Sequence, residues 1–128
     1  MKGERVVATV GAIEAIKGRR SVRRYLPDPV PREVIEDIVD CGRLAPSARN
    51  DQPWEFVVVT DQTIREEIAA AATYGKFIAD APVCVLAFAR QTRRHTEDTC
   101  AAVENMLIAA YAHGLGSCWI AGENTPYE

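Results

Sequence analysis

Apolar positions along the chain follow two patterns, a helical spacing and short continuous runs. From Val34 to Val39 apolar residues recur at helical spacing, which predicts a helix that begins near Pro31 and ends near Leu44. The run FVVVT at residues 56–60 is continuous and rich in β-branched residues, so we predict a buried strand there. Helix and strand patterns therefore alternate along the chain.

The same signals predict the remaining elements. Gly18 is a favoured residue at a helix C-terminus, and Thr63 with Glu66 has the spacing of a capping box. Together with the apolar pattern they predict helices at residues 12–18, 63–72 and 96–112, and strands at residues 83–89 and 117–121. This alternation indicates a two-layer or three-layer α/β domain, with residues 1–128 as a single unit.

Two segments are more polar than a connector requires. The basic segment, GRRSVRRY at residues 18–25, carries four arginines and a serine, and arginine forks match the oxygens of a phosphate. A solvated charged turn and an RNA-binding patch are the alternatives. The polar loop, residues 46–52, places hydrogen-bonding side chains between a helix and a strand, where one or two turn residues would suffice. The amides of Asn50 and Gln52 both donate and accept, so they suit the edge of a flat polar ring.

Charge and hydropathy narrow the class of protein. The chain has a formal net charge of -3 and a pI near 5.4, which argues against general binding to nucleic acid or anionic lipid. The apolar stretch at residues 82–89 is too short to cross a membrane, which takes about 20 residues. The N-terminus contains Glu4 and Glu14 and lacks a secretory apolar region, so we predict a cytoplasmic protein.

The four cysteines are scattered and form no CxxC pair. We interpret them as buried or half-buried thiols, because an unpaired cysteine packs as a small hydrophobic residue. A zinc site with His95 or His113 is disfavoured, since no pair of ligands has zinc-finger spacing. We therefore predict no metal.

Three blocks of sequence, RRSVRRY, APSARNDQPWEFVVV and AVENMLIAAYAHGLGSCWIAG, occur in this order and cover most of residues 12–122. In identity and spacing they resemble the nitroreductase family of flavoproteins. The resemblance implies an α+β fold with a central, mostly antiparallel sheet flanked by helices, in an intertwined homodimer that binds FMN between its subunits. The largely apolar helix at residues 96–112 also favours a dimer. Because family members continue with a further helix, another strand and basic residues, the chain is expected to lack the C-terminal part.

The resemblance also assigns residues to FMN. The basic segment would hold the phosphate and ribityl side, the polar loop would reach the same FMN from the partner subunit, and the last block would lie along the isoalloxazine ring. In that order, the residues are Arg19, Arg20, Ser21 and Arg23; Pro46, Ser47, Ala48 and Asn50, with Gln52 supporting the loop; and Trp119, Ile120, Ala121 and Gly122.

The implied activity is an FMN-dependent oxidoreductase with ping-pong kinetics. NAD(P)H would deliver hydride to the flavin N5, and a nitroaromatic, a quinone or a similar small acceptor would then occupy the same pocket. No catalytic side chain is predicted, because the cofactor carries the chemistry. Two alternatives stay open: a specialised flavin enzyme such as a dehalogenase or a cofactor-cleaving oxygenase, and a non-catalytic protein that binds flavin or dimerises.

Overall fold

The computed structural model describes residues 8–121. Its helices and strands come in the order predicted, except at the C-terminal end. They are α1 (Ala12–Gly18), α2 (Arg32–Arg43), β1 (Trp54–Val59), α3 (Gln62–Ala71), β2 (Cys84–Ala89) and α4 (His95–Ala112), with 3-10 turns at Ala48–Asn50 and Lys76–Asp80.

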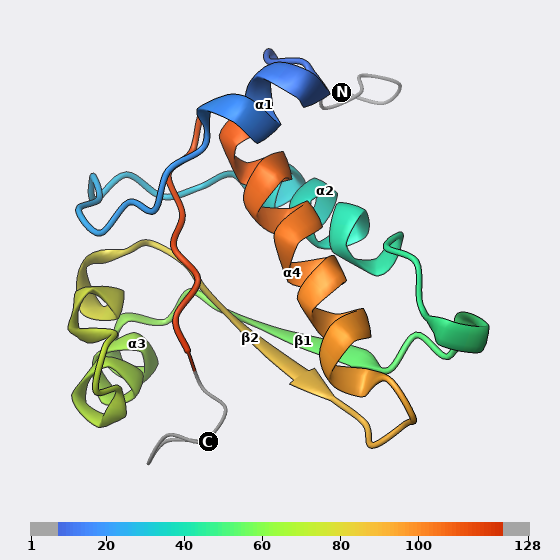
Figure 1. Ribbon diagram of the computed structural model, residues 1–128. Coiled ribbons are helices and arrows are strands. Elements are labelled where there is room, and N and C mark those ends of the chain that lie inside the picture. The colour runs from blue at the N-terminus through green and yellow to red at the C-terminus, as the bar shows by residue number, and fades with distance from the viewer. Residues whose placement is uncertain (1–7, 122–128) are drawn as a thin grey trace.

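Helix α4 is the centre of the fold and contacts α1, α2, β1 and β2 (Figure 1). Its apolar residues are spread around the helix, and several of them are buried: Ala102, Met106, Leu107, Ala109 and Ala110. A helix that is apolar all round must be covered on several sides. In this chain α1 and α2 cover one side of α4 and the sheet covers another.

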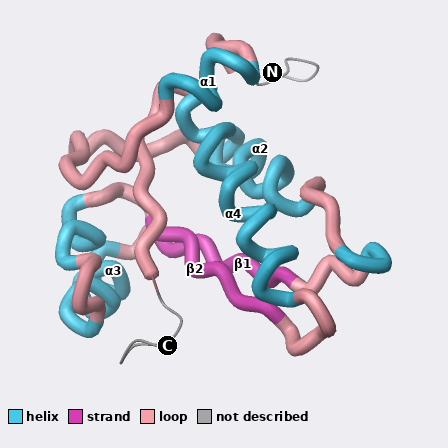
Figure 2. The backbone as a smooth tube through the Cα atoms, viewed as in Figure 1, coloured by secondary structure: helices cyan, strands magenta, loops and turns pink. Residues whose placement is uncertain are grey.

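The sheet has two antiparallel strands, with Trp54 opposite Ala89 and Val59 opposite Cys84 (Figure 2). Alternate side chains point to opposite faces of a strand, so Trp54 and Phe56 lie on the face that packs against Ala102 of α4. Trp54 is 8% exposed and is therefore a core residue.

The strand predicted at residues 56–60 forms, but the prediction that it is buried was right only in part, since Val59 is 7% exposed while its neighbours are not buried. Val57 and Val58 are 48% and 39% exposed, and Phe88 on the neighbouring strand is 49% exposed. The apolar run indicated burial on both faces, but within residues 8–121 the sheet has no covering layer over Val57 and Phe88. Helix α3 covers only the end near Val59 and Cys84.

The prediction of a third strand at residues 117–121 was also wrong. Within the described residues this segment forms only an isolated parallel bridge between Ser117 and Ser21. The β-branched and aromatic composition favours a strand, but a strand needs a neighbour to pair with. Here the segment runs beside the basic segment instead of β1 or β2.

Contacts between α2 and α4 satisfy the polar groups buried there. The Asn105 side-chain amide donates to the carbonyl of Cys41 at 3.0 Å. The Nε2 atom of His113, whose side chain is 5% exposed, lies 2.6 Å from Oδ2 of Asp37. Gly42 packs so tightly on Met106 that an added Cβ would lie 2.7 Å from Met106 Cγ.

Helix α3 begins differently from the prediction. Its cap is Asp61, which accepts a hydrogen bond from the backbone amide of Ile64 at 2.9 Å, and the predicted capping box of Thr63 and Glu66 does not form. An aspartate at the capping position satisfies a free amide of the first turn as well as a threonine does. All four cysteines are partly buried, as predicted. Among residues 8–121 we find no helix with the length and hydropathy that a membrane span requires.

Candidate functional site

The basic segment leaves α1 in an extended conformation. The guanidinium of Arg20 turns back and donates to the carbonyls of Lys17, Gly18 and Arg19 at 3.1, 3.2 and 2.8 Å. Arg20 therefore closes the C-terminal end of α1. Arg19 and Arg23 differ, because no carboxylate among the described residues lies within ion-pair distance of either.

The basic segment is joined to the segment that follows α4. The amide of Val22 donates to the carbonyl of Ser117 at 2.9 Å, next to the bridge between Ser21 and Ser117. Gly116 permits this approach, since a Cβ there would lie 2.9 Å from Cβ of Val22. The structure thus places the segment that leads to Trp119 beside the basic segment of the same chain. Gly116 was not among the predicted residues.

The residues after Ser117 have different surroundings. Trp119 is 45% exposed and so is not a core residue of this chain. Ile120 packs against the small apolar cluster that contains Ala72 and Ile78. Ala121 is exposed, and Gly122 lies outside the described residues.

An open cavity of about 530 Å³ lies beside the basic segment, lined by Arg23, Arg24, Tyr25, Pro27, Gln62, Arg65, Ala79, Asp80, Ala81 and Pro82. The Tyr25 hydroxyl donates to the carbonyl of Val22. Burial raises the pKa of Tyr25 to about 12, the nearby Cys118 adds to the rise, and Arg23 opposes it. At neutral pH the tyrosine therefore stays uncharged beside Arg23.

The polar loop has an unusual backbone. Arg49, Asn50 and Gln52 have φ angles of 56°, 56° and 47°. Residues other than glycine rarely adopt this left-handed conformation, and where several do so close together the loop has to be held in place by its surroundings. Within the loop, Ser47 Oγ accepts from the amide of Gln52 at 3.0 Å, and the Gln52 side-chain amide donates to Asn50 Oδ1 at 2.9 Å.

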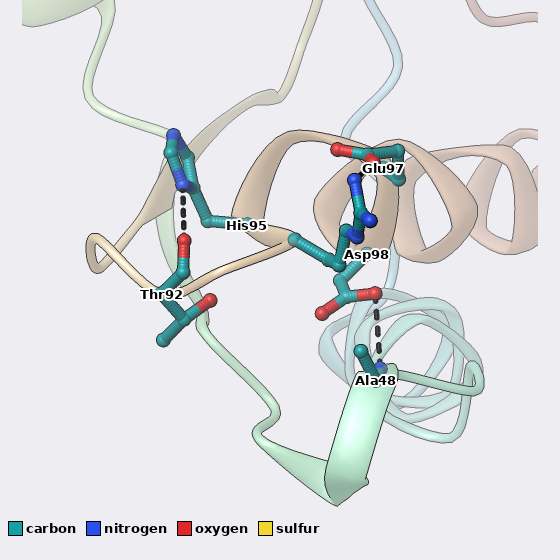
Figure 3. A network of polar contacts seen from close by, with 6 residues as sticks. Ala48, Thr92, His95, Glu97 and Asp98 are labelled. Carbon is teal, nitrogen blue, oxygen red and sulfur yellow. Dashed lines mark hydrogen bonds and ion pairs between the residues drawn. The ribbon is translucent and has the colours of Figure 1, made fainter.

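Two residues outside the polar loop form hydrogen bonds with its backbone. Asp98, in the first turn of α4, accepts from the amide of Ala48 at 3.1 Å (Figure 3). Arg90 donates to the carbonyls of Asp51 and Gln52 at 3.1 and 2.9 Å. Neither residue was predicted, because the sequence gives no local signal for either contact. Asp98 lies 50 positions from Ala48, and Arg90 lies 39 positions from Asp51.

The region from Arg90 to Asp98 is exposed only in part. Arg90 is exposed, but α4 already begins at His95 and Asp98 is 7% exposed. The His95 ring nitrogen Nδ1 lies 2.8 Å from the carbonyl of Thr92 and closes the turn before the helix (Figure 3).

Within one chain the polar loop and the basic segment lie at opposite ends of α4 (Figure 1). Asp98 at the N-terminal end of the helix holds the polar loop, while the amides of Thr9 and Val10, just before α1, donate to the carbonyl of Ala112 at the other end. At 1.5 Å per residue, Asp98 and Ala112 are about 21 Å apart along the helix. One phosphate or one ring edge therefore does not contact both segments of a single chain.

The side chains present fit a flavin mononucleotide in kind. The guanidinium groups of Arg19 and Arg23 have no acidic partner in the described part of the chain and match a phosphate, and the Asn50 and Gln52 amides match the polar edge of a ring. A metal ion has no comparable set of ligands, since no three His, Cys, Asp or Glu side chains in residues 8–121 lie close enough to hold one.

Comparisons with known proteins agree with this architecture. The model of the "Nitroreductase family" matches residues 16–73 and 70–126. A curated relative from Methanothermobacter thermautotrophicus, named "Putative NADH dehydrogenase/NAD(P)H nitroreductase", is 36% identical over 118 residues, which are 88% of this chain and 62% of that protein. The chain thus spans less than two thirds of this relative's length.

Solved structures show the same fold. A protein of the same name from Bacteroides thetaiotaomicron superposes with a TM-score of 0.86 at 36% identity, covering 88% of this chain and 68% of the other. A protein described as an FMN-dependent nitroreductase from Clostridium difficile superposes with a TM-score of 0.82 at 32% identity, covering 91% and 69%. These likenesses confirm the predicted α+β fold, while the predicted homodimer stays a prediction.

Proposed function

Because the chain belongs to the nitroreductase family, we propose that it binds FMN and acts as an oxidoreductase. In this proposal NAD(P)H is the hydride donor, and a nitroaromatic, a quinone or a similar small molecule is the acceptor. The observation that carries the proposal is a pair of segments at opposite ends of α4. One contains arginines without an acidic partner among residues 8–121, and the other contains amides on a left-handed backbone.

In the proposed site, each FMN lies between two copies of the chain. Arg19, Ser21 and Arg23 of one copy bind the phosphate side, and Asn50 of the other copy reaches the same cofactor. Gln52 supports Asn50 through the hydrogen bond between their side chains. Arg20 has a structural task, because its guanidinium already closes α1.

In this proposal the protein binds and orients the FMN and tunes its reactivity. When bound, the flavin ring accepts and releases the hydride, so no side chain of the chain has to act as acid or base. Arg23 has no acidic partner among residues 8–121 and would supply positive charge to the phosphate of FMN. Tyr25 adds no compensating negative charge, since its raised pKa keeps it neutral.

The direct test is spectroscopic. Purified chain of verified intact mass is titrated with FMN, and NADH or NADPH is then added in a stopped-flow instrument. We expect flavin absorbance on binding and its bleaching by at least one of the two donors. A protein that binds FMN but is bleached by neither donor supports a non-catalytic flavin-binding protein, and one that stays colourless contradicts the proposal.

A second test addresses the shared site. One variant carries Arg19→Gln and Arg23→Gln, and the other carries Asn50→Asp, which tolerates the left-handed backbone. Each variant alone is expected to bind FMN poorly. In a two-fold heterodimer one site collects both lesions and the other collects neither, so co-expression restores about a quarter of the sites. Absence of recovery means that both segments act within one chain.

A further inference from the structure

We propose that Asp98 is a positioning residue, which fixes the polar loop in the conformation that presents Asn50 and Gln52 to the cofactor. This inference rests on the proposed FMN site. Its starting point is the contact between Asp98 Oδ1 and the amide of Ala48, which joins the first turn of α4 to the loop (Figure 3).

The burial of Asp98 is costly without such a task. The residue is 7% exposed, and its second oxygen, Oδ2, has no hydrogen-bond partner among the described residues. A buried carboxylate loses its hydration, and the N-terminal end of α4 returns only part of that free energy. The hydrogen bond from the amide of Ala48 is the interaction that burial of the Asp98 carboxylate makes possible.

The polar loop needs an external restraint. The left-handed residues Arg49, Asn50 and Gln52 are not glycines, so the backbone of a free loop would relax to other conformations. Asp98 restrains the start of the loop through Ala48, and Arg90 restrains its end through two carbonyls. Together they fix both ends of the left-handed stretch.

The restraint affects cofactor binding through populations. If only a fraction of molecules has the loop in the binding conformation, the apparent affinity falls by that fraction. A hydrogen bond to a charged acceptor corresponds to about a 10- to 100-fold change in such an equilibrium. We therefore expect removal of the Asp98 carboxylate to weaken FMN binding by a factor in this range, without altering any proposed FMN contact.

The experiment compares Asp98→Ala with Asp98→Asn and with Glu104→Ala, a control at an exposed position of the same helix. Loop order is measured without flavin, as the rate of tryptic cleavage after the exposed Arg49 and as amide hydrogen exchange in residues 47–52. The dissociation constant of FMN is measured in parallel. We expect the largest changes in Asp98→Ala, intermediate changes in Asp98→Asn, whose amide oxygen still accepts from Ala48, and no change in the control.

The outcomes separate this inference from the proposed FMN site. Faster cleavage and exchange confined to the loop support the role of Asp98 in restraining the loop. If the natural chain does not bind FMN, that result contradicts the proposed FMN site and leaves the restraint itself in place. Cleavage and exchange at natural rates in Asp98→Ala overturn it, and so does a change that is uniform over the whole chain. If Asp98→Ala does not fold, Asp98→Asn and Arg90→Met provide the same comparison, and natural loop behaviour in both overturns the inference.

Discussion

Arg65 is a buried cation whose partners are backbone carbonyls. The residue is 9% exposed, and its guanidinium donates to the carbonyls of Thr60 at 3.4 Å, Ala79 at 3.0 Å and Ala81. These carbonyls lie before α3 and before β2, so one side chain ties two connections together. A planar fork with several fixed donors can serve such separated acceptors, which lysine cannot do in the same way.

Replacing Arg65 with methionine is expected to lower the free energy of unfolding by about 3 kcal/mol, because buried carbonyls lose donors that carry a charge. Urea denaturation followed by circular dichroism measures the loss. The matched control is Arg32→Ala, since the Arg32–Glu36 pair is 90% and 63% exposed and water screens the attraction between its charges. Equal effects of the two changes would contradict a special role for the buried guanidinium.

Tyr25 links stability to alkaline pH. Its folded pKa, about 12, lies above the ordinary value of 10.0, so the neutral phenol is favoured by folding. This contribution is complete below pH 10 and is lost as the pH rises from 10 to 12, because the unfolded chain ionises first. We expect the natural chain to lose stability relative to Tyr25→Phe over that interval. Urea midpoints between pH 9 and 12 test this, and parallel curves would exclude the linkage.

The sequence predicted the role of a residue well where that role depends on its neighbours in the chain. Gly18 ends α1 as predicted, and a strand forms at the run FVVVT as predicted. Asp98 and Arg90 were missed because their partners are distant in the sequence. The choice of Asp61 over Thr63 as the cap of α3 shows a smaller limit, since both residue types favour this position.

At the scale of elements, the contact between α2 and α4 depends on a residue without a side chain. A Cβ at Gly42 would lie 2.7 Å from Cγ and 2.9 Å from Sδ of Met106. In an exposed helix, alanine in place of glycine is favourable by up to about 1 kcal/mol. Here the close approach of Met106 reverses that sign.

We expect Gly42→Ala to destabilise the protein by about 1–2 kcal/mol, because Met106 has to leave its position and the two helices separate slightly. Thermal and urea unfolding measure the change. Gly11→Ala is the control, since an added Cβ there meets nothing within 4 Å. Stabilisation by Gly42→Ala would show that Met106 repacks without cost and that the spacing of the helices is not fixed by this glycine.

Helices and strands could be predicted from the sequence where their pattern of apolar residues was long enough. The helices α2 and α4 and the strands β1 and β2 were located within a few residues, since their apolar spacing reflects their own geometry. Residues 117–121 failed as a strand because pairing is a property of two segments, and the basic segment rather than β1 or β2 is their neighbour. Similarly, the burial of β1 depends on layers that its own sequence does not report.

For the whole molecule, large apolar side chains are exposed on several faces. Ile13 and Ile16 of α1 are 67% and 55% exposed, and Val57 and Phe88 on the outer face of the sheet are about half exposed. Large apolar side chains that the described residues leave exposed are available for contact with a partner chain. This supports the proposed homodimer. The cytoplasmic location stays a prediction.

A site built from two chains makes cofactor binding depend on protein concentration. We expect sedimentation velocity to show a dimer, and FMN to shift dissociation of that dimer to lower protein concentration, because a ligand that binds only the dimer stabilises it by mass action. A dilution series with and without FMN measures both effects. A monomer that binds FMN with undiminished affinity would contradict the shared site.

The sequence blocks identified the segments of the candidate site but not their arrangement. RRSVRRY and the loop around Asn50 were recognisable because each is a compact motif. Their separation along α4 could not be deduced, since it depends on how α1, α2 and the sheet pack around that helix.

Helix α4 therefore sets the distance between the two segments of the proposed site, because one segment lies at each end of the helix. An inserted residue would lengthen the rod by about 1.5 Å and rotate everything beyond it by about 100°, so it would misalign both cofactor pockets of a symmetric pair in a single event. Replacement of an outward-facing side chain would leave the spacing intact. The length of α4, more than its composition, is then the property that natural variants of this chain must preserve.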